Sequence, residues 1–392
     1  MSPDTPPYPG LMHYLDHAAT TPTLPEVREA VAACLEEDFG NPSSLHGYGR
    51  RARQVVEDAR DKVALAIGAD PSEIVFTGGG TEADNLALQG ATYKRRGNGD
   101  HIVVSAFEHH AVLDTADWLA KQGWDVTRAP VTEDGLVEPA AVTDALKPST
   151  VLVSVMAVNN EVGTIQDIAA NASSVKEANR RTLVHTDAVQ ALGNVPVDVG
   201  AWGVDLASFA AHKLGGPKGV GALYVRSGVP VEAILHGGGQ ERGIRSGTLN
   251  VPAISGFGVA AEIAAKEVGE KADRLTSLRT KLFEGMLSIV PDLQINGHAT
   301  RRIPGNLNVA IPGADGETLL LLLDRAGIAC SAGSACASGA IDPSHVLTAM
   351  GIGTDRAGGS LRFSLGRAST QADVDAVLAA LPEVVTRARR AA

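Results

Sequence analysis

The chain has few cysteines and few aromatic residues. Its 392 residues include three cysteines, Cys34, Cys330 and Cys336, and aromatic side chains make up 4%. An odd and sparse set of cysteines excludes the disulfide frameworks of small secreted proteins. We therefore expect a reducing, cytoplasmic environment, and we interpret Cys34 as a small core residue of an amphipathic helix.

Long apolar runs and an excess of positive charge are also missing. No apolar stretch approaches the roughly 20 residues of a membrane-spanning helix. The Pro-rich residues 1–10 lack the basic and apolar pattern of a signal peptide. The formal net charge is −11, which does not attract nucleic acid. We expect no direct contact with membranes or nucleic acid.

Glycine is abundant, with 43 residues, and short apolar runs alternate with segments of helical periodicity. The pattern predicts strands at 74–76, 102–104, 151–155, 183–185, 206–209 and 221–225, and helices at 25–35, 50–67, 81–94, 112–121 and 168–179. Such alternation is typical of an α/β fold with a mainly parallel sheet and crossover helices.

The regular alternation of strand and helix patterns ends after a long helical stretch at 252–289. Strands are predicted at 307–311 and 360–364, and helices at 317–325 and 372–387. We predict a large α/β domain over residues 17–268 and a smaller α+β domain formed by residues 1–16 and 269–392.

A glycine-rich turn, Thr77 to Glu82, lies between a predicted strand and a predicted helix. The free N–H groups and the dipole of a helix N-terminus favour an anion, and glycines let the backbone approach it. Gly80 and Thr81 are therefore candidate phosphate ligands. The turn lacks the Gly-Lys-Ser/Thr ending of a Walker loop, and a purely structural turn explains it equally well.

Two further strand ends carry residues with possible chemical roles. The strand at 206–209 leads to His212 and Lys213, and a buried lysine must be neutralised or used, for example in a Schiff base. An exposed loop lysine is an equally good interpretation. Asp187 follows the strand at 183–185 and suits either a protonated ring nitrogen or a helix N-cap.

Histidine and cysteine residues complete the candidates. His109 follows the strand at 102–104 and could stack on a ring or move protons, whereas His110 suits a solvent-facing turn. Cys336 lies in a run of small residues, 330–340, that predicts a mobile loop able to bring a thiol to a substrate. No neighbouring His or Cys pair has metal-ligand spacing. We interpret Cys330 as a buried strand residue.

The motifs occur in an order that resembles one family. They are Tyr14 to Pro22, Asn41 to His46, Gly80 to Glu82, Val158 to Gly163, His212-Lys213, Gly237 to Arg242, Arg245 to Thr248, Ser334 to Cys336 and Leu361 to Gly366. Together they resemble the cysteine desulfurases of the NifS/IscS group, within the fold-type I enzymes that use pyridoxal 5′-phosphate (PLP). The loop around Cys336 resembles the long-loop subgroup.

The resemblance implies a role for each matching residue. Lys213 would hold PLP and move the Cα proton, and His109 would stack on the ring. Asp187 would pair with the ring nitrogen and Gln190 with the ring oxygen. The remaining roles are phosphate binding by Gly80, Thr81 and His212, phosphate binding across a homodimer by Thr248, a cofactor contact by Asn160, and substrate carboxylate binding by Asn160 and Arg362.

One position departs from the family pattern. Many members have a serine two residues before the His-Lys pair as a phosphate contact, and here that residue is Ala210. We expect one phosphate hydrogen bond fewer, with Ser208 pointing elsewhere, and somewhat weaker PLP retention.

The implied reaction converts L-cysteine to L-alanine and leaves a persulfide on Cys336. An acceptor protein, such as an iron–sulfur scaffold or a tRNA-thiolation enzyme, would take the sulfur. No resident metal is expected, although Cys336 could serve as a transient iron–sulfur ligand. Two alternatives stay open: another fold-type I enzyme, such as an aminotransferase or C–S lyase, and a non-catalytic paralogue that binds partners.

Overall fold

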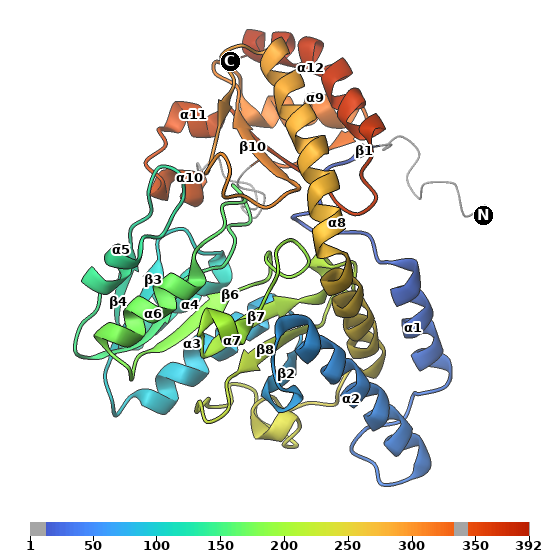
Figure 1. Ribbon diagram of the computed structural model, residues 1–392, viewed down its shortest axis with the longest axis vertical. Coiled ribbons are helices and arrows are strands. Elements are labelled where there is room, and N and C mark those ends of the chain that lie inside the picture. The colour runs from blue at the N-terminus through green and yellow to red at the C-terminus, as the bar shows by residue number, and fades with distance from the viewer. Residues whose placement is uncertain (1–12, 333–343, 392) are drawn as a thin grey trace.

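A helix of 39 residues, α8 (Val251–Ile289), runs between two parts of the molecule (Figure 1). The computed structural model describes residues 13–332 and 344–391. Pro252 lies in the first turn of α8, where its missing N–H costs no hydrogen bond, and Asn250 caps that turn. The change from an α/β to an α+β pattern predicted around this helix coincides with the passage from one part to the other.

The larger part is built on a seven-stranded sheet with the order β2-β8-β7-β6-β5-β3-β4. Its strands are β2 (Ile74–Thr77), β3 (His101–Ser105), β4 (Asp125–Ala129), β5 (Thr150–Ser154), β6 (Leu183–Asp187), β7 (Leu206–Ala210) and β8 (Gly221–Val225). All neighbouring pairs are parallel except those that β8 makes with β2 and β7. The mainly parallel α/β sheet is thus confirmed.

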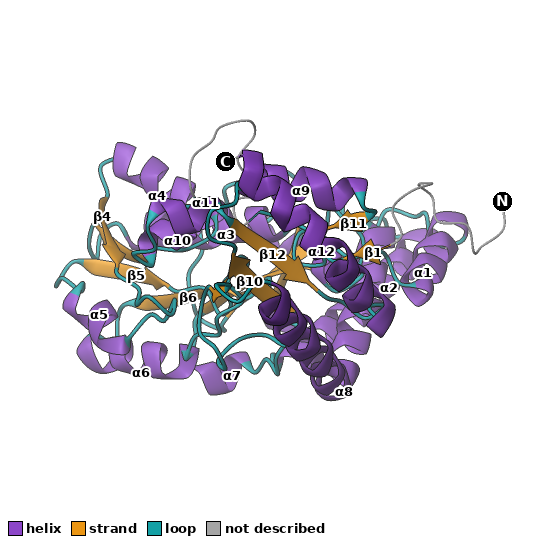
Figure 2. Cartoon of the chain, turned by 90° about the horizontal axis from the view of Figure 1, so that it is seen from above, coloured by secondary structure: helices purple, strands orange, loops and turns teal. Residues whose placement is uncertain are grey.

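Helices cover both faces of this sheet. They are α1 (Pro25–Glu36), α2 (Gly47–Ile67), α3 (Gly80–Arg95), α4 (His110–Lys121), α5 (Pro139–Asp144), α6 (Ile168–Ala178) and α7 (Val199–Trp202). Figure 2 shows α4 on one side of the strands and α5, α6 and α7 on the other. Alternate strand residues enter opposite cores, as Val103 and Ile102 do. The strands are buried on both faces, which explains their uninterrupted apolar sequences.

The antiparallel β8 has a local cause. Residues 211–220 connect it to β7 and contain, as regular structure, one 3₁₀ turn, Ala211–Lys213. A parallel return requires a crossover of a dozen or more residues, so the chain pairs directly instead, with Ala207 opposite Tyr224. This short connection places Lys213 just after the C-terminal end of β7.

The smaller part combines short strands with helices. Its strands are β1 (His13–Tyr14), β9 (Gln294–Ile295), β10 (Asn306–Ala310), β11 (Ile328–Ala329) and β12 (Ser360–Ser364), and its main helices are α9 (Gly316–Arg325) and α12 (Gln371–Ala391). They enclose a separate core that includes Leu15, Leu282 and Phe363. The pairing of β1 with β11 joins the N-terminal residues to this part. The exact domain boundaries, 17–268 against 1–16 and 269–392, stay a prediction.

Residues 344–358 pack against the larger part, although most of the other C-terminal residues form the smaller part. They form α10 (His345–Ala349) and α11 (Thr354–Gly358), and Val346, Leu347 and Met350 pack into the core of the larger part. Cys330, by contrast, packs against the core of the smaller part. Cys330 therefore belongs to the smaller part, and Val346 to the larger part.

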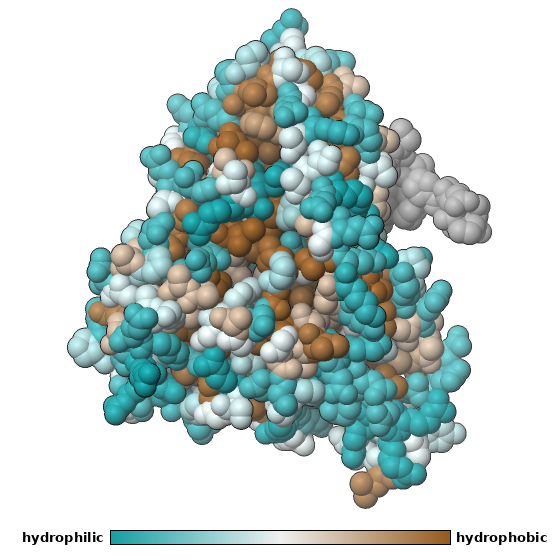
Figure 3. All heavy atoms as spheres, in the orientation of Figure 1, coloured by the Kyte–Doolittle hydropathy of each residue, from teal (hydrophilic) through white to brown (hydrophobic). Residues whose placement is uncertain are grey.

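Most of the visible surface is hydrophilic (Figure 3). Over the ranges 13–332 and 344–391, no helix combines the length and apolar character needed to cross a bilayer.

Candidate active site

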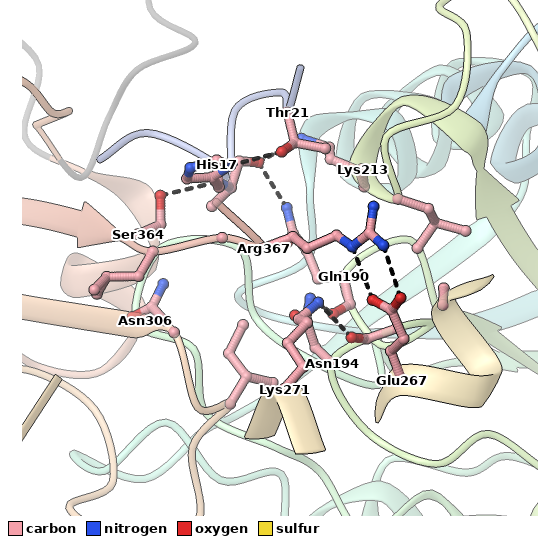
Figure 4. A pocket seen from close by; sticks show the side chains of 18 of the residues that line it. His17, Thr21, Gln190, Asn194, Lys213, Glu267, Lys271, Asn306, Ser364 and Arg367 are labelled. Atoms are coloured by element: carbon pink, nitrogen blue, oxygen red, sulfur yellow. Dashed lines mark hydrogen bonds and ion pairs between the residues drawn. The ribbon is translucent and has the colours of Figure 1, made fainter. Parts of the chain in front are cut away.

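Lys213 ends the 3₁₀ turn after β7 and points toward the N-terminal segment of the chain. Its Nζ donates hydrogen bonds to the carbonyl oxygens of Ala18, at 2.5 Å, and Ala19, at 2.8 Å. The side chain is partly buried, which excludes the exposed loop lysine. Lys213 also lines a cavity between the two parts of the molecule, together with Gln190 and His17 (Figure 4).

Asp187 is the last residue of β6, so its carboxylate lies at the same sheet edge as Lys213. The side chain is buried and accepts a hydrogen bond from the N–H of Val189 at 2.9 Å. Burial raises the pKa of Asp187, and the nearby His109 and Lys213 oppose that shift. No helix starts here among the described residues, so the N-cap interpretation is wrong. Gln190 donates its Nε2 to the carbonyl of Ala18 at 2.9 Å.

His109 caps the N-terminus of α4. Its Nδ1 accepts a hydrogen bond from the N–H of Ala111 at 3.1 Å, so a neutral ring carries its proton on Nε2. Burial lowers the pKa of His109, and Lys213 lowers it further, while Asp187 acts in the opposite direction. His109 is thus a neutral imidazole near neutral pH, and His110 is exposed as expected.

The predicted phosphate ligands gather in one groove. Gly80 and Thr81, at the N-terminus of α3, line it with His212, Thr20 and Lys218. A Cβ at Gly80 would lie 2.7 Å from a methyl group of Val189, so only glycine lets the backbone reach this position. Burial lowers the pKa of His212 to about 4, with a further contribution from Lys213.

Thr20 and Lys218 were not predicted as ligands from the sequence. Thr20 Oγ1 lies 3.1 Å from Nδ1 of His212, and Lys218 follows in the Gly/Pro turn. Thr20 belongs to the motif Tyr14 to Pro22, whereas Lys218 lies outside the named motifs, and only the fold brings both residues to α3.

Ala210 is buried behind this groove, next to the start of α3. A Cβ at Gly80 would lie 3.5 Å from the methyl group of Ala210, so a serine there would direct its hydroxyl toward the start of α3. Ser208 points elsewhere, as expected, because its hydroxyl lies 3.0 Å from Nε2 of the buried His185. No hydroxyl from Ser208 therefore compensates for Ala210.

Arg362 and Asn160 meet at the boundary between the two parts. Arg362, on β12, is 3% exposed, and its Nη1 donates to the backbone oxygen of Asn160 at 2.9 Å. Its Nη2 donates to Asp16 at 2.8 Å, a contact that the sequence did not indicate. The buried Arg362 Nε and Asn160 Oδ1 have no hydrogen-bond partner among the described residues. Such unsatisfied groups suit a bound polar ligand.

These residues fit PLP. The glycine-lined helix start suits its phosphate, the buried Asp187 suits its ring nitrogen, and the amine of Lys213 suits its aldehyde. The unsatisfied Arg362 Nε suits a carboxylate beside it.

Two predicted residues are not part of this cluster in the described chain. Thr248 is exposed in the turn before α8, where its predicted role toward a partner subunit stays a prediction. Cys336 lies outside the described residues, between Ala332 and Ser344.

The two described cysteines are unsuited to nucleophilic attack. Burial raises the pKa of Cys330 to about 12, and it also raises the pKa of the buried Cys34. Both thiols are free, and both stay protonated near neutral pH. Cys34 is confirmed as a core residue of α1, whereas Cys330 is only partly buried and directly follows β11.

Comparisons with known proteins agree with this site. The aminotransferase class-V family model matches residues 13–377. A cysteine desulfurase IscS from Methanosarcina thermophila is 48% identical, with 96% of this chain and 92% of the relative covered. An IscS-like cysteine desulfurase from Mycobacterium tuberculosis is 49% identical, with 97% and 98% covered.

A solved structure described as a NifS-like protein shares the fold. Its TM-score is 0.91 at 40% identity, with 96% of this chain and 100% of the solved chain covered. The chain therefore belongs to the aminotransferase class-V family of PLP-dependent enzymes.

Proposed function

We propose that the protein is a cysteine desulfurase that takes sulfur from L-cysteine and holds it as a persulfide on Cys336. The relatives that match almost the whole chain carry this activity in their names. The observation that carries the proposal is that Lys213, Asp187 and His109 lie close together at the carboxyl ends of the strands. His109 and Lys213 are near enough to Asp187 for both to lower its pKa. PLP, when bound, supplies an electron sink for charge that develops at the substrate Cα.

The substrate carboxylate would meet Arg362 and Asn160. Both contribute a buried polar atom that lacks a partner among the described residues. Asp16 and the backbone of Asn160 hold the guanidinium in place from two sides. A preorganised guanidinium can bind a carboxylate with little loss of side-chain entropy. We infer that this pair orients L-cysteine.

Lys213 has two tasks in this scheme. Its Nζ would hold the cofactor covalently, and the same amine would move the proton at Cα of the bound substrate. The carbonyls of Ala18 and Ala19 lie within hydrogen-bond distance and keep the amine close to the site. His109, neutral and with its proton on Nε2, would exchange a proton with the substrate thiol.

Cys336 would act as the nucleophile. A thiolate attacks the substrate sulfur, a sulfur–sulfur bond forms, the Cβ–S bond breaks, and protonation at carbon gives alanine. The start of its segment is tied to the site, because Ser331 donates its N–H to the backbone oxygen of Arg362 at 3.1 Å. Cys34 and Cys330 are poor candidates because burial keeps both thiols protonated.

We also propose a homodimer in which Thr248 reaches the phosphate site of the partner subunit. An acceptor protein, either an iron–sulfur scaffold or a tRNA-thiolation enzyme, would receive the persulfide sulfur in the cytoplasm. The absence of a disulfide framework from the sequence supports a reducing compartment.

Product analysis tests the proposed function. The purified protein with PLP and L-cysteine should form alanine and, with a reductant, an equal amount of sulfide. Lys213→Ala should lose both products together with the visible absorption of bound PLP. A keto acid that retains the sulfur would show an aminotransferase, and pyruvate with ammonia and free sulfide would show a C–S lyase; either result would contradict the proposal.

A further inference from the structure

We propose that Ser344 and Glu161 are positioning residues for the attack by Cys336. A buried hydrogen bond between them fixes the first described residue after Cys336 next to Asn160, one of the two predicted carboxylate ligands. This inference rests on the proposed function, in which Cys336 is the nucleophile.

Ser331 and Ser344, described residues on either side of the segment that contains Cys336, are each hydrogen-bonded beside the candidate substrate site. At one end, Ser331 exchanges two backbone hydrogen bonds with Arg362, of 3.1 and 2.7 Å. At the other end, the hydroxyl of Ser344 donates to Oε2 of Glu161 at 2.5 Å. Glu161 directly follows Asn160, so each end is attached next to one of the two predicted carboxylate ligands.

Glu161 is a rigid attachment point. Its side chain is buried, with 4% of the residue exposed. Its N–H donates to the side-chain oxygen of Asn159 at 2.9 Å. Its backbone oxygen accepts the side-chain amides of Asn306 and Asn308, each at 3.2 Å. Three hydrogen bonds from β10 and the turn thus hold the backbone of the residue whose carboxyl group receives Ser344.

His345 adds a second attachment beside the first. Its Nε2 donates to the backbone oxygen of Glu108 at 2.9 Å, and its ring lies 4.5 Å from that of His110. Glu108 and His110 flank His109, the residue predicted to stack on the cofactor. Residues 344–345 are therefore fastened both to the turn with Asn160 and to the strand end with His109.

The carboxyl group of Glu161 is costly where it stands. Burial raises its pKa to about 7, whereas the Ser344 hydrogen bond and the charge of Arg362 lower it. A glutamine or an apolar residue would avoid the cost of burying a charge. A carboxylate, however, accepts a stronger hydrogen bond from the Ser344 hydroxyl than a neutral group does.

Chain length explains why this attachment matters. Cys336 is five residues from Ser331 and eight from Ser344. With at most ~3.6 Å per residue, the covalent chain permits a maximum distance of roughly 18 Å from Ser331 and roughly 29 Å from Ser344. Each fixed end restricts the volume open to the thiol, and small misplacements of reacting groups lower rates strongly.

The test measures persulfide formation on Cys336 in a single turnover. Ser344→Ala should slow it by about tenfold, because the thiol is less well positioned. The visible absorption of bound PLP and the affinity for L-alanine, which reports on the carboxylate site, should stay unchanged. Thr348→Ala, which removes a hydrogen bond within α10 to the backbone oxygen of Ser344, is the matched control and should have a small effect.

A second variant keeps the test decisive if Ser344→Ala does not fold. Glu161→Met removes the acceptor for the Ser344 hydroxyl with a side chain of similar length and should slow persulfide formation while L-alanine affinity is retained. The double variant should be no slower than the slower single variant, because both act through one bond. An unchanged rate, or a loss of L-alanine affinity equal to the loss of rate, would overturn the inference.

The outcome separates this inference from the proposed function. If Cys336→Ala abolishes persulfide formation and Ser344→Ala does not affect it, the positioning role fails alone. If Cys336→Ala still gives wild-type desulfuration, the proposed function itself fails.

Discussion

At the scale of single residues, the phosphate site has one hydroxyl group fewer than the family resemblance implies. The methyl group of Ala210 faces Gly80, and the hydroxyl of Ser208 is engaged with His185 in the interior. The remaining candidates, Thr20, Thr81, His212 and Lys218, all line the groove. The groove therefore offers several hydrogen-bond donors to a phosphate, and a hydroxyl group at position 210 would add one more.

Ala210→Ser should increase the affinity of the PLP-free protein for PLP. A new hydrogen bond to a phosphate anion is worth about 1.5–3 kcal/mol at best, which corresponds to roughly tenfold or more in affinity. Titration with PLP, followed by absorption, measures the effect. Ala207→Ser adds a hydroxyl to the other face of β7 and should give no gain; equal affinities of Ala210→Ser and the wild type would contradict the account.

At the scale of elements, buried polar contacts connect the strand ends that form the site. Glu108, after β3, accepts the N–H of Met156 at 2.6 Å and the hydroxyl of Ser105 at 2.5 Å. Both donors reach Oε1, while Oε2 has no partner among the described residues. This asymmetry fits a neutral acid with its proton on Oε2, and burial raises the pKa of Glu108 to about 8.

Glu108→Gln should change how stability depends on pH. The folded-state pKa lies above the usual value of 4.5, so the favourable contribution of Glu108 is complete below pH 4.5 and is lost as the pH rises toward about 8. Between pH 5 and 8 the wild type should lose roughly 3 kcal/mol relative to the variant. Urea unfolding of the PLP-free proteins at a fixed concentration measures this difference; parallel pH profiles would show that Glu108 is not neutral in the fold.

Local sequence patterns predicted the positions of most helices and strands. They did not predict the side-chain contacts between distant parts of the chain. The apolar runs predicted β2, β3, β5, β6, β7 and β8, and the helix predicted at 50–67 ends at Ile67, where Gly68 adopts a left-handed conformation with φ 69°. The edge strand β4 was missed because its residues are mostly polar and partly exposed. The Arg362–Asp16 and Ser344–Glu161 contacts join residues 346 and 183 positions apart, and no local pattern encodes such pairs.

At the scale of the whole molecule, the site lies where the two parts meet. Lys213 and Asp187 come from the larger part, whereas Arg362 comes from β12 of the smaller part. Exposed Thr248 lies in the turn before α8, which is accessible to a second subunit. The proposed homodimer would complete each phosphate site with a residue from the other chain.

Mixed dimers test this arrangement. In a dimer of one Lys213→Ala chain and one Thr248→Ala chain, one site should contain Lys213 and an intact Thr248 from the partner. Co-expression with two affinity tags should thus yield wild-type PLP affinity at half of the sites. If the PLP-binding site keeps the reduced affinity of the Thr248→Ala homodimer, Thr248 acts within its own chain.

The central claim is that Cys336 takes the sulfur of L-cysteine at a PLP site built around Lys213. The most direct measurement is the mass of the protein after one turnover with L-cysteine, compared between the wild type and Cys336→Ala. The wild type should gain one sulfur atom on the peptide that contains Cys336. The variant should keep the visible absorption of bound PLP and gain none. Persulfide on another cysteine, or alanine formed by Cys336→Ala at the wild-type rate, would contradict the claim.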